Sequence, residues 1–203
     1  MLSHLALAFI HLFLMLLIGD EDLNNNKTIF AISIVVGALI ISVILNLHYY
    51  VNLRRESENV LHNMRARALA SYGGEVVTIA YFLEEYLETS DLDIIDKQVS
   101  WGIARAQWEA DICTQGLSEG SGLMYYELRH TVHVLENYFV WKINGPLNKT
   151  KVENIAQSLY VIGTTFSGFD LLKNKDPLEM LSSSSVDTVN NYCRQIQEIV
   201  GKP

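Results

Sequence analysis

The chain has 203 residues, of which 49% are apolar, and its formal net charge at pH 7 is −8. Residues 72–203 carry ten Lys and Arg against eighteen Asp and Glu, a net charge of −8, whereas residues 52–71 carry four Arg and two Glu, a net charge of +2. The acidic body excludes a nucleic-acid-binding module, because such modules need a basic face toward the phosphates.

Two apolar stretches near the N-terminus predict a transmembrane hairpin. Residues 2–19 and 28–47 contain no Lys, Arg, Asp or Glu, and each is close to the roughly 20 residues that a helix needs to cross a bilayer. A cleaved signal peptide is the alternative for the first stretch. That alternative needs a positively charged start and a small-residue cleavage site, and the start Met-Leu-Ser-His offers no Lys or Arg. We therefore expect two retained spans joined by a short polar loop.

Charge flanking the second span predicts its orientation. Positive residues close to a span stay on the cytoplasmic side. Arg54, Arg55, Arg65 and Arg67 follow the span, whereas the loop before it holds Lys27 against Asp20, Glu21 and Asp22. The sequence predicts a two-pass integral membrane protein with its C-terminal domain in the cytoplasm.

The stretch that leaves the second span is suited to the membrane surface. Tyr49 and Tyr50 match the aromatic belt found at membrane interfaces, and Arg54 and Arg55 match the anionic headgroups. We expect these four side chains to contact membrane lipid.

The sequence predicts three regions: a transmembrane hairpin over residues 1–51, a basic juxtamembrane helical stalk over 52–72, and an acidic helical bundle over 73–203. No long segment alternates with period two, so the fold class is all-α, with four or five helices in the bundle. Gly73 and Gly74 are expected to loosen the helix at the end of the stalk.

Apolar residues at helical spacing mark the expected core. In chain order they are Leu61, Met64, Ala68 and Tyr72 in the stalk; Val76, Ile79, Ala80, Leu83 and Leu87 in residues 75–88; Ile95, Val99, Ile103, Ala106, Ala110 and Cys113 in a helix ending near 114; Met124, Leu128, Val132, Leu135 and Phe139 in residues 122–143; Val152, Ile155, Leu159, Ile162, Phe166 and Phe169 in the next helix; and Val189, Cys193, Ile196 and Val200 in residues 186–200.

Three helix starts are suggested by capping residues. Ser90 is a candidate cap for the helix that follows it. Thr150 with Glu153 has the spacing of a capping box. Asp176 before Pro177 predicts a short helical turn, because proline suits the first helical position.

Tryptophans could either line a ligand pocket or belong to the core. Trp101 and Trp108 are two turns apart and would widen the apolar stripe of their helix, and Trp141 lies near the end of the next one. Aromatic residues on helical stripes are more often core, so we expect these three to be buried.

The segment ELRHTVHVLENY, residues 127–138, holds the densest set of candidate ligands. Glu127, His130, His133 and Glu136 follow one another at intervals of three, and a Glu-x-x-His unit is one half of a di-metal carboxylate site in helical bundles. No second Glu-x-x-His unit exists in the chain. At 100° per residue the four side chains spread around the polar side of the helix, so a solvated face is the favoured interpretation and a metal or acid–base site is the alternative.

The predicted spans contain two further features. His11 is an ionisable group at membrane depth, which suggests either a buried hydrogen bond or a proton or ion pathway in an oligomer. Ser33 and Gly37, four residues apart, would let two helix backbones approach closely.

The two cysteines, Cys113 and Cys193, lack Cys-x-x-Cys spacing and are expected to be buried thiols. No nucleotide-binding or nucleophile motif is present, and the sequence indicates no cofactor. The favoured function is a membrane-anchored interaction or signalling adaptor subunit, with membrane lipid, a protein partner and a possible homo-oligomer as its contacts. A tethered helical-bundle enzyme remains the alternative.

Overall fold

The computed structural model describes residues 25–115, 117, 122–141, 147–166 and 176–201. Across these residues the secondary structure is helical and includes no β-strand, which confirms the all-α class. The chain divides into two compact units, Met1–Ser57 and Glu58–Pro203. We describe each unit separately.

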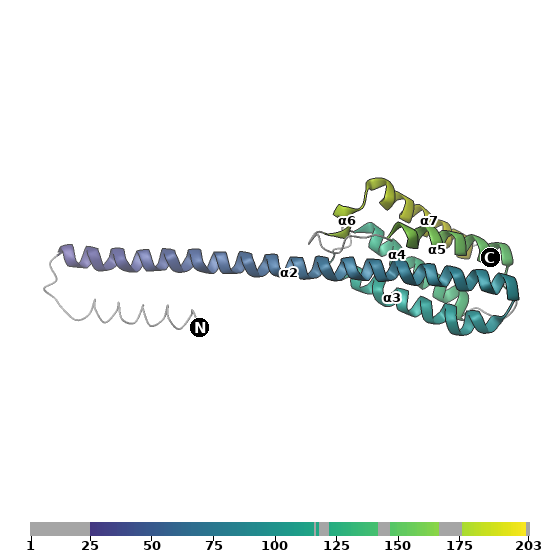
Figure 1. Ribbon diagram of the computed structural model, residues 1–203. Coiled ribbons are helices and arrows are strands. Elements are labelled where there is room, and N and C mark those ends of the chain that lie inside the picture. The colour runs from purple at the N-terminus through teal and green to yellow at the C-terminus, as the bar shows by residue number, and fades with distance from the viewer. Residues whose placement is uncertain (1–24, 116, 118–121, 142–146, 167–175, 202–203) are drawn as a thin grey trace. The chain divides into compact units, whose positions relative to one another are not determined.

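The described part of the first unit is the beginning of α2 (Asn25–Thr89), a helix of 65 residues (Figure 1). Large apolar side chains between Ile32 and Leu53 are exposed around this helix. Among the described residues, α2 is the one helix long and apolar enough to cross a membrane, and its apolar window is not buried by protein. The two-helix hairpin is not confirmed, because residues 2–19 lie outside the described part of the chain.

The second unit is a helical bundle. Figure 1 shows α3 (Ser100–Thr114), α4 (Leu123–Glu136), α5 (Lys149–Thr165) and α7 (Ser183–Gly201) alongside the C-terminal part of α2. A π-helical turn, η1 (Ile94–Val99), leads into α3, and a second, η2 (Asn137–Trp141), follows α4 and contacts η1. The short α6 (Pro177–Met180) precedes α7.

The bundle core is the one that helical spacing predicts. From Val76 onward, the described core positions are all buried except Leu87 and Val200, which are half-buried. Phe169 lies outside the described residues. The amphipathic pattern therefore identifies most of the inward-facing residues of these helices, although it misses Tyr86, Ile94 and Tyr125, which are also buried. In the stalk, the predicted core residue Met64 is exposed.

The bundle includes part of the segment that the sequence assigns to the stalk. The compact unit begins at Glu58, and Arg65, Leu69 and Tyr72 are buried within it. The helix also continues through Gly73 and Gly74 without a break. The expectation that these glycines loosen it is wrong.

Gly73 instead allows α2 and α5 to pack closely. A Cβ atom at Gly73 would lie 2.9 Å from Cβ of Phe166 and 3.0 Å from the carbonyl oxygen of Gly163. A Cβ at Gly163 would collide with Val77 and with the carbonyl oxygen of Gly73. The two helices cross where neither has a side chain, and the Tyr72 ring packs edge-on against Phe166 with centroids 6.3 Å apart.

Two of the three predicted caps are wrong. Ser90 ends α2 in a left-handed conformation (φ 58°) and donates its backbone N–H to Tyr86. Asn148, not Thr150, caps α5 by accepting the backbone N–H of Lys151. Asp176 does cap α6, accepting the backbone N–H of Leu178 at 2.9 Å.

The adjacent glycines of α2 provide a matched test of the close packing. Gly73→Ala should destabilise the protein by about 1–3 kcal/mol, because its methyl group overpacks the contact with α5. Gly74→Ala meets no atom within 4 Å and should stabilise the helix by about 0.5–1 kcal/mol. Thermal unfolding of the full chain in detergent, followed by circular dichroism, measures both. Equal effects of the two substitutions would contradict the close crossing.

Candidate functional site

Two tryptophans on α3 face solvent. Trp101 is 62% exposed and Trp108 is 69% exposed, and Trp141 at the end of η2 is 72% exposed. The expectation that these three tryptophans belong to the core is therefore wrong. The inward face of α3 is already filled by Ile103, Ala106 and Ala110, which are buried. At 100° per residue Trp101 and Trp108 lie about 160° and 140° away from Ile103 around the helix axis. These angles alone would have predicted that the two tryptophans face away from the core.

Trp101, Ala104, Arg105 and Trp108 form a continuous exposed surface along α3, which we name the α3 ridge. The Arg105 guanidinium lies over the Trp101 ring, 4.6 Å from its centroid. The same guanidinium is 2.5 Å from a carboxylate oxygen of Glu75 on α2. The ridge is therefore aromatic, and its one cation is held in place by a neighbouring carboxylate.

Further charges near the ridge are also paired. Lys97, one turn before Trp101, has its Nζ atom 2.7 Å from a carboxylate oxygen of Asp93. The hydrogen bond with Asp93 is the main cause of the raised pKa of Lys97. Asp111, which follows Trp108 by three residues, is 2.7 Å from Arg129 on α4. Arg105, Lys97 and Asp111 are thus each paired with a charge of opposite sign, while Glu109, which follows Trp108, accepts a hydrogen bond from the Ser71 hydroxyl at 2.8 Å.

The outer face of α2 has a different character. Glu84, Glu85 and Glu88 are exposed there. Tyr81 is exposed on the same face and packs edge-on against Tyr160 of α5. This acidic face accounts for part of the negative charge of the bundle.

The structure separates Glu127 from the other candidate metal ligands. Gln197 of α7 donates its Nε2 to a carboxylate oxygen of Glu127 at 3.0 Å and to Thr131 Oγ1 at 3.2 Å. Nε of Arg194 lies 3.6 Å from the other carboxylate oxygen. Glu127 thus connects α4 to α7.

His130 and His133 are exposed on a different side of α4, where Nδ1 of His133 lies 3.6 Å from a carboxylate oxygen of Glu136. In the part of the chain that the structure describes, no three His, Cys, Asp or Glu side chains lie where they could hold one metal ion. The two histidines line an open groove of about 440 Å³ between α3 and α4. The groove is lined by Gln107, Tyr126, Arg129, His130 and His133.

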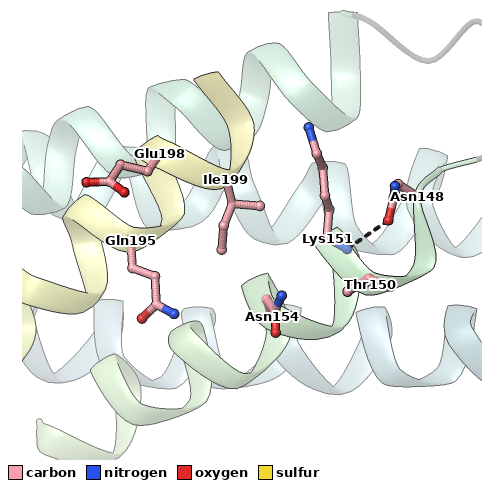
Figure 2. A pocket seen from close by; sticks show the side chains of 7 residues that line it. All are labelled: Asn148, Thr150, Lys151, Asn154, Gln195, Glu198 and Ile199. Carbon is pink, nitrogen blue, oxygen red and sulfur yellow. Dashed lines mark hydrogen bonds between the residues drawn. The ribbon is translucent and has the colours of Figure 1, made fainter. Parts of the chain in front are cut away.

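A second hollow, of about 340 Å³, lies between the start of α5 and the last turns of α7. Figure 2 shows Ile199 facing it between the amide side chains of Gln195 and Asn154. Lys151 and Glu198 also line the hollow, and their charged ends point away from each other in this view. The lining combines amides, both signs of charge and one apolar side chain, so it selects no single ligand chemistry.

A polar cluster around the buried Arg65 joins four segments at one end of the bundle. Arg65 of α2 is 3% exposed. Its Nη1 donates to Asp176 at 3.0 Å and its Nη2 donates to the carbonyl oxygen of Gln115 at 2.6 Å. The Tyr125 hydroxyl donates to the other Asp176 oxygen at 3.1 Å. The sequence analysis counts Arg65 among the positive charges that orient the second span, but the structure places it in an internal ion pair with Asp176.

Burial decides the acid–base behaviour of this region. It raises the pKa of the Tyr125 hydroxyl, and the Asp176 carboxylate raises it further. Burial is also the main cause that raises the pKa of Cys113 and of Cys193 to about 12. Both cysteines are free and buried, as the sequence predicts, and as protonated buried thiols they are poor nucleophiles.

The predicted membrane-facing residues are exposed where the structure describes them. Tyr49, Tyr50, Arg54 and Arg55 all lie on the surface of α2. Ser33 is also exposed. A Cβ on Gly37 would meet no atom within 4 Å, so among the described residues no helix packs closely there.

His11 lies outside the described residues, and its suggested role stays a prediction.

Comparison with known proteins finds no matching family model, no matching curated protein and no matching solved structure.

Loss of the partly buried Asp176 carboxylate should destabilise the bundle more than loss of an exposed one. Asp176→Ala leaves the Arg65 guanidinium buried without a counterion and should cost about 3 kcal/mol. Asp93→Ala breaks the exposed pair with Lys97 and should have a far smaller effect, because water screens that pair. Urea unfolding of the full chain in detergent compares the two variants. A similar loss for both would contradict the structural role of Asp176.

Proposed function

We propose that the chain is a membrane-anchored helical interaction subunit whose bundle binds a protein partner at the cytoplasmic membrane face. The observation that carries this proposal is the α3 ridge, where two tryptophans and an arginine are exposed together on a rigid helix. Tryptophan and arginine are enriched among the residues that dominate binding energy at protein interfaces.

The exposed start of α2 supports the membrane anchor. Its large apolar side chains, such as Ile40, Val43 and Leu47, are uncovered in the described structure. A lipid environment would remove them from water, at about 25 cal/mol for each Å² of apolar surface. The exposed Arg54 and Arg55 that follow suit the cytoplasmic leaflet.

The ridge supports protein binding for a further reason. An exposed tryptophan contributes little to the stability of its own bundle, yet it offers a large apolar surface at low cost in side-chain entropy. Arg105 is already oriented by Glu75 and Trp101, so little ordering remains for a partner to impose.

Accessibility of an introduced thiol tests the anchor and its orientation. Gln157→Cys places an exposed thiol on α5, away from the α3 ridge, while Cys113 and Cys193 are buried and protonated and should give little background. A membrane-impermeant maleimide should label this variant only after the cells are opened. Labelling of intact cells, judged against the parent chain, would place the bundle outside and overturn the cytoplasmic assignment.

The double variant Trp101→Ala/Trp108→Ala tests the ridge. It should change the free energy of unfolding by less than about 1 kcal/mol, because both side chains are exposed. It should weaken partner binding by more than about 1 kcal/mol for each tryptophan. Quantitative co-purification from membranes in mild detergent, with Gln157→Ala on α5 as the control, measures this. Equal partner recovery with both variants would remove the ridge as the binding surface.

A further inference from the structure

We propose that the open groove between α3 and α4 is a binding site for a phosphate monoester. The proposal is independent of the α3 ridge and of the membrane anchor, because every residue it uses belongs to the compact unit Glu58–Pro203. Three observations carry it: the register of the lining side chains on α4, the hydrogen-bonding groups among them that have no partner, and the size of the groove.

The lining of the groove follows from the register of α4. Its members on this helix are Tyr126, Arg129, His130 and His133. They occupy positions i, i+3, i+4 and i+7, so they share one face of the helix. Leu128 and Val132 are buried in the core on another face, which fixes the direction of the lining face. Gln107 of α3 completes the lining.

Most hydrogen-bonding groups of the lining are free. Within the described residues, no hydrogen bond is made by either Nη atom of Arg129, by the amide of Gln107 or by the imidazole of His130. Nε of Arg129 lies 2.7 Å from a carboxylate oxygen of Asp111. This contact orients the guanidinium and leaves its Nη atoms available to a ligand.

The free groups suit a phosphate. A guanidinium can donate to two oxygens of one phosphate at the same time. A glutamine amide adds two donors, and each neutral imidazole adds one. A carboxylate offers two oxygens to these donors, whereas a phosphate monoester offers three. A cation would instead meet the positive charge of Arg129.

The carboxylates beside the groove already lie against lining side chains. Asp111 is next to Arg129, and a carboxylate oxygen of Glu136 is 3.6 Å from Nδ1 of His133. Residues 72–203 carry a net charge of −8, so the field of the whole bundle does not attract an anion. We therefore expect a weak affinity that depends on the short-range hydrogen bonds of the groove.

The size of the groove suits a small organic phosphate. Its volume of about 440 Å³ falls within the range of roughly 300–1,000 Å³ that small-molecule sites have. The Tyr126 hydroxyl donates to the carbonyl oxygen of Leu117 at 3.4 Å, which holds the ring beside the groove. The flat surfaces of Tyr126 and of the two imidazoles suit the organic group of the ester.

Protection of His130 and His133 from diethyl pyrocarbonate tests the proposal on the full chain in detergent. Peptide mass spectrometry reports the modification of each histidine. Saturating phenyl phosphate should slow the modification of these two histidines by about tenfold, because a ligand in the groove covers them, and should leave the exposed His48 of α2 unchanged. Benzoate, which carries a carboxylate on the same ring, should need an about tenfold higher concentration for the same protection.

Two matched arginine variants identify the group that binds the phosphate. Arg129→Gln should weaken the protection by at least about tenfold, whereas Arg194→Gln on α7 should leave it unchanged. The two arginine side chains are 54% and 56% exposed, and each has its Nε near one carboxylate. Both variants therefore lose the same charge from a similar setting. Circular dichroism confirms that each bundle is folded before the rates are compared.

Reconstituted vesicles distinguish a soluble ligand from a lipid headgroup. The full chain is labelled in phosphatidylcholine vesicles with and without phosphatidic acid, whose headgroup is itself a phosphate monoester. Protection by phenyl phosphate alone would identify a soluble ligand, and protection by phosphatidic acid would identify the headgroup. The proposal is overturned by equal protection from benzoate, by protection that persists in Arg129→Gln, or by no protection from either phosphate.

Discussion

The close approach of α2 and α5 at Gly73 and Gly163 is the constraint on which the bundle depends. Each glycine lies against backbone of the opposite helix, so the helices cross at a distance that no side chain would permit. Tyr72 then meets Phe166 edge-on, and its hydroxyl reaches the carbonyl oxygen of Leu128 at 3.4 Å. Burial of this tyrosine in the middle of the core raises its pKa well above the usual value, and its one polar atom is satisfied by α4.

Polar contacts at the bundle ends complement this apolar centre. Arg65, Asp176 and Tyr125 bring α2, α4 and the start of α6 together. The Nε atom of Arg65 is buried without a hydrogen-bond partner in the described structure, which adds a desolvation cost that the other contacts of the guanidinium must offset. In such a cluster, removal of one partner is costly because it leaves the other charge buried without a counterion.

Local pairing of charge distinguishes the α3 ridge from the rest of an acidic protein. Glu75 neutralises Arg105 beneath it, and Arg129 neutralises Asp111 beside it. The ridge therefore combines exposed aromatic surface with low local charge, whereas the outer face of α2 is acidic. The proposed interaction depends on this contrast and on the rigidity of the helix that carries it.

The sequence by itself determined the helical class and most of the core, because amphipathic spacing is a local property that one helix displays alone. It also identified the apolar start of α2 and the cap at Asp176. Only the tertiary structure decided that Gly73 packs rather than breaks a helix, that Arg65 pairs with a residue 111 positions away, and that Glu127 joins α7 instead of His130 and His133. Each of these depends on which helices become neighbours in space. That choice is made by the packing of whole helices against one another, and short-range spacing does not encode it.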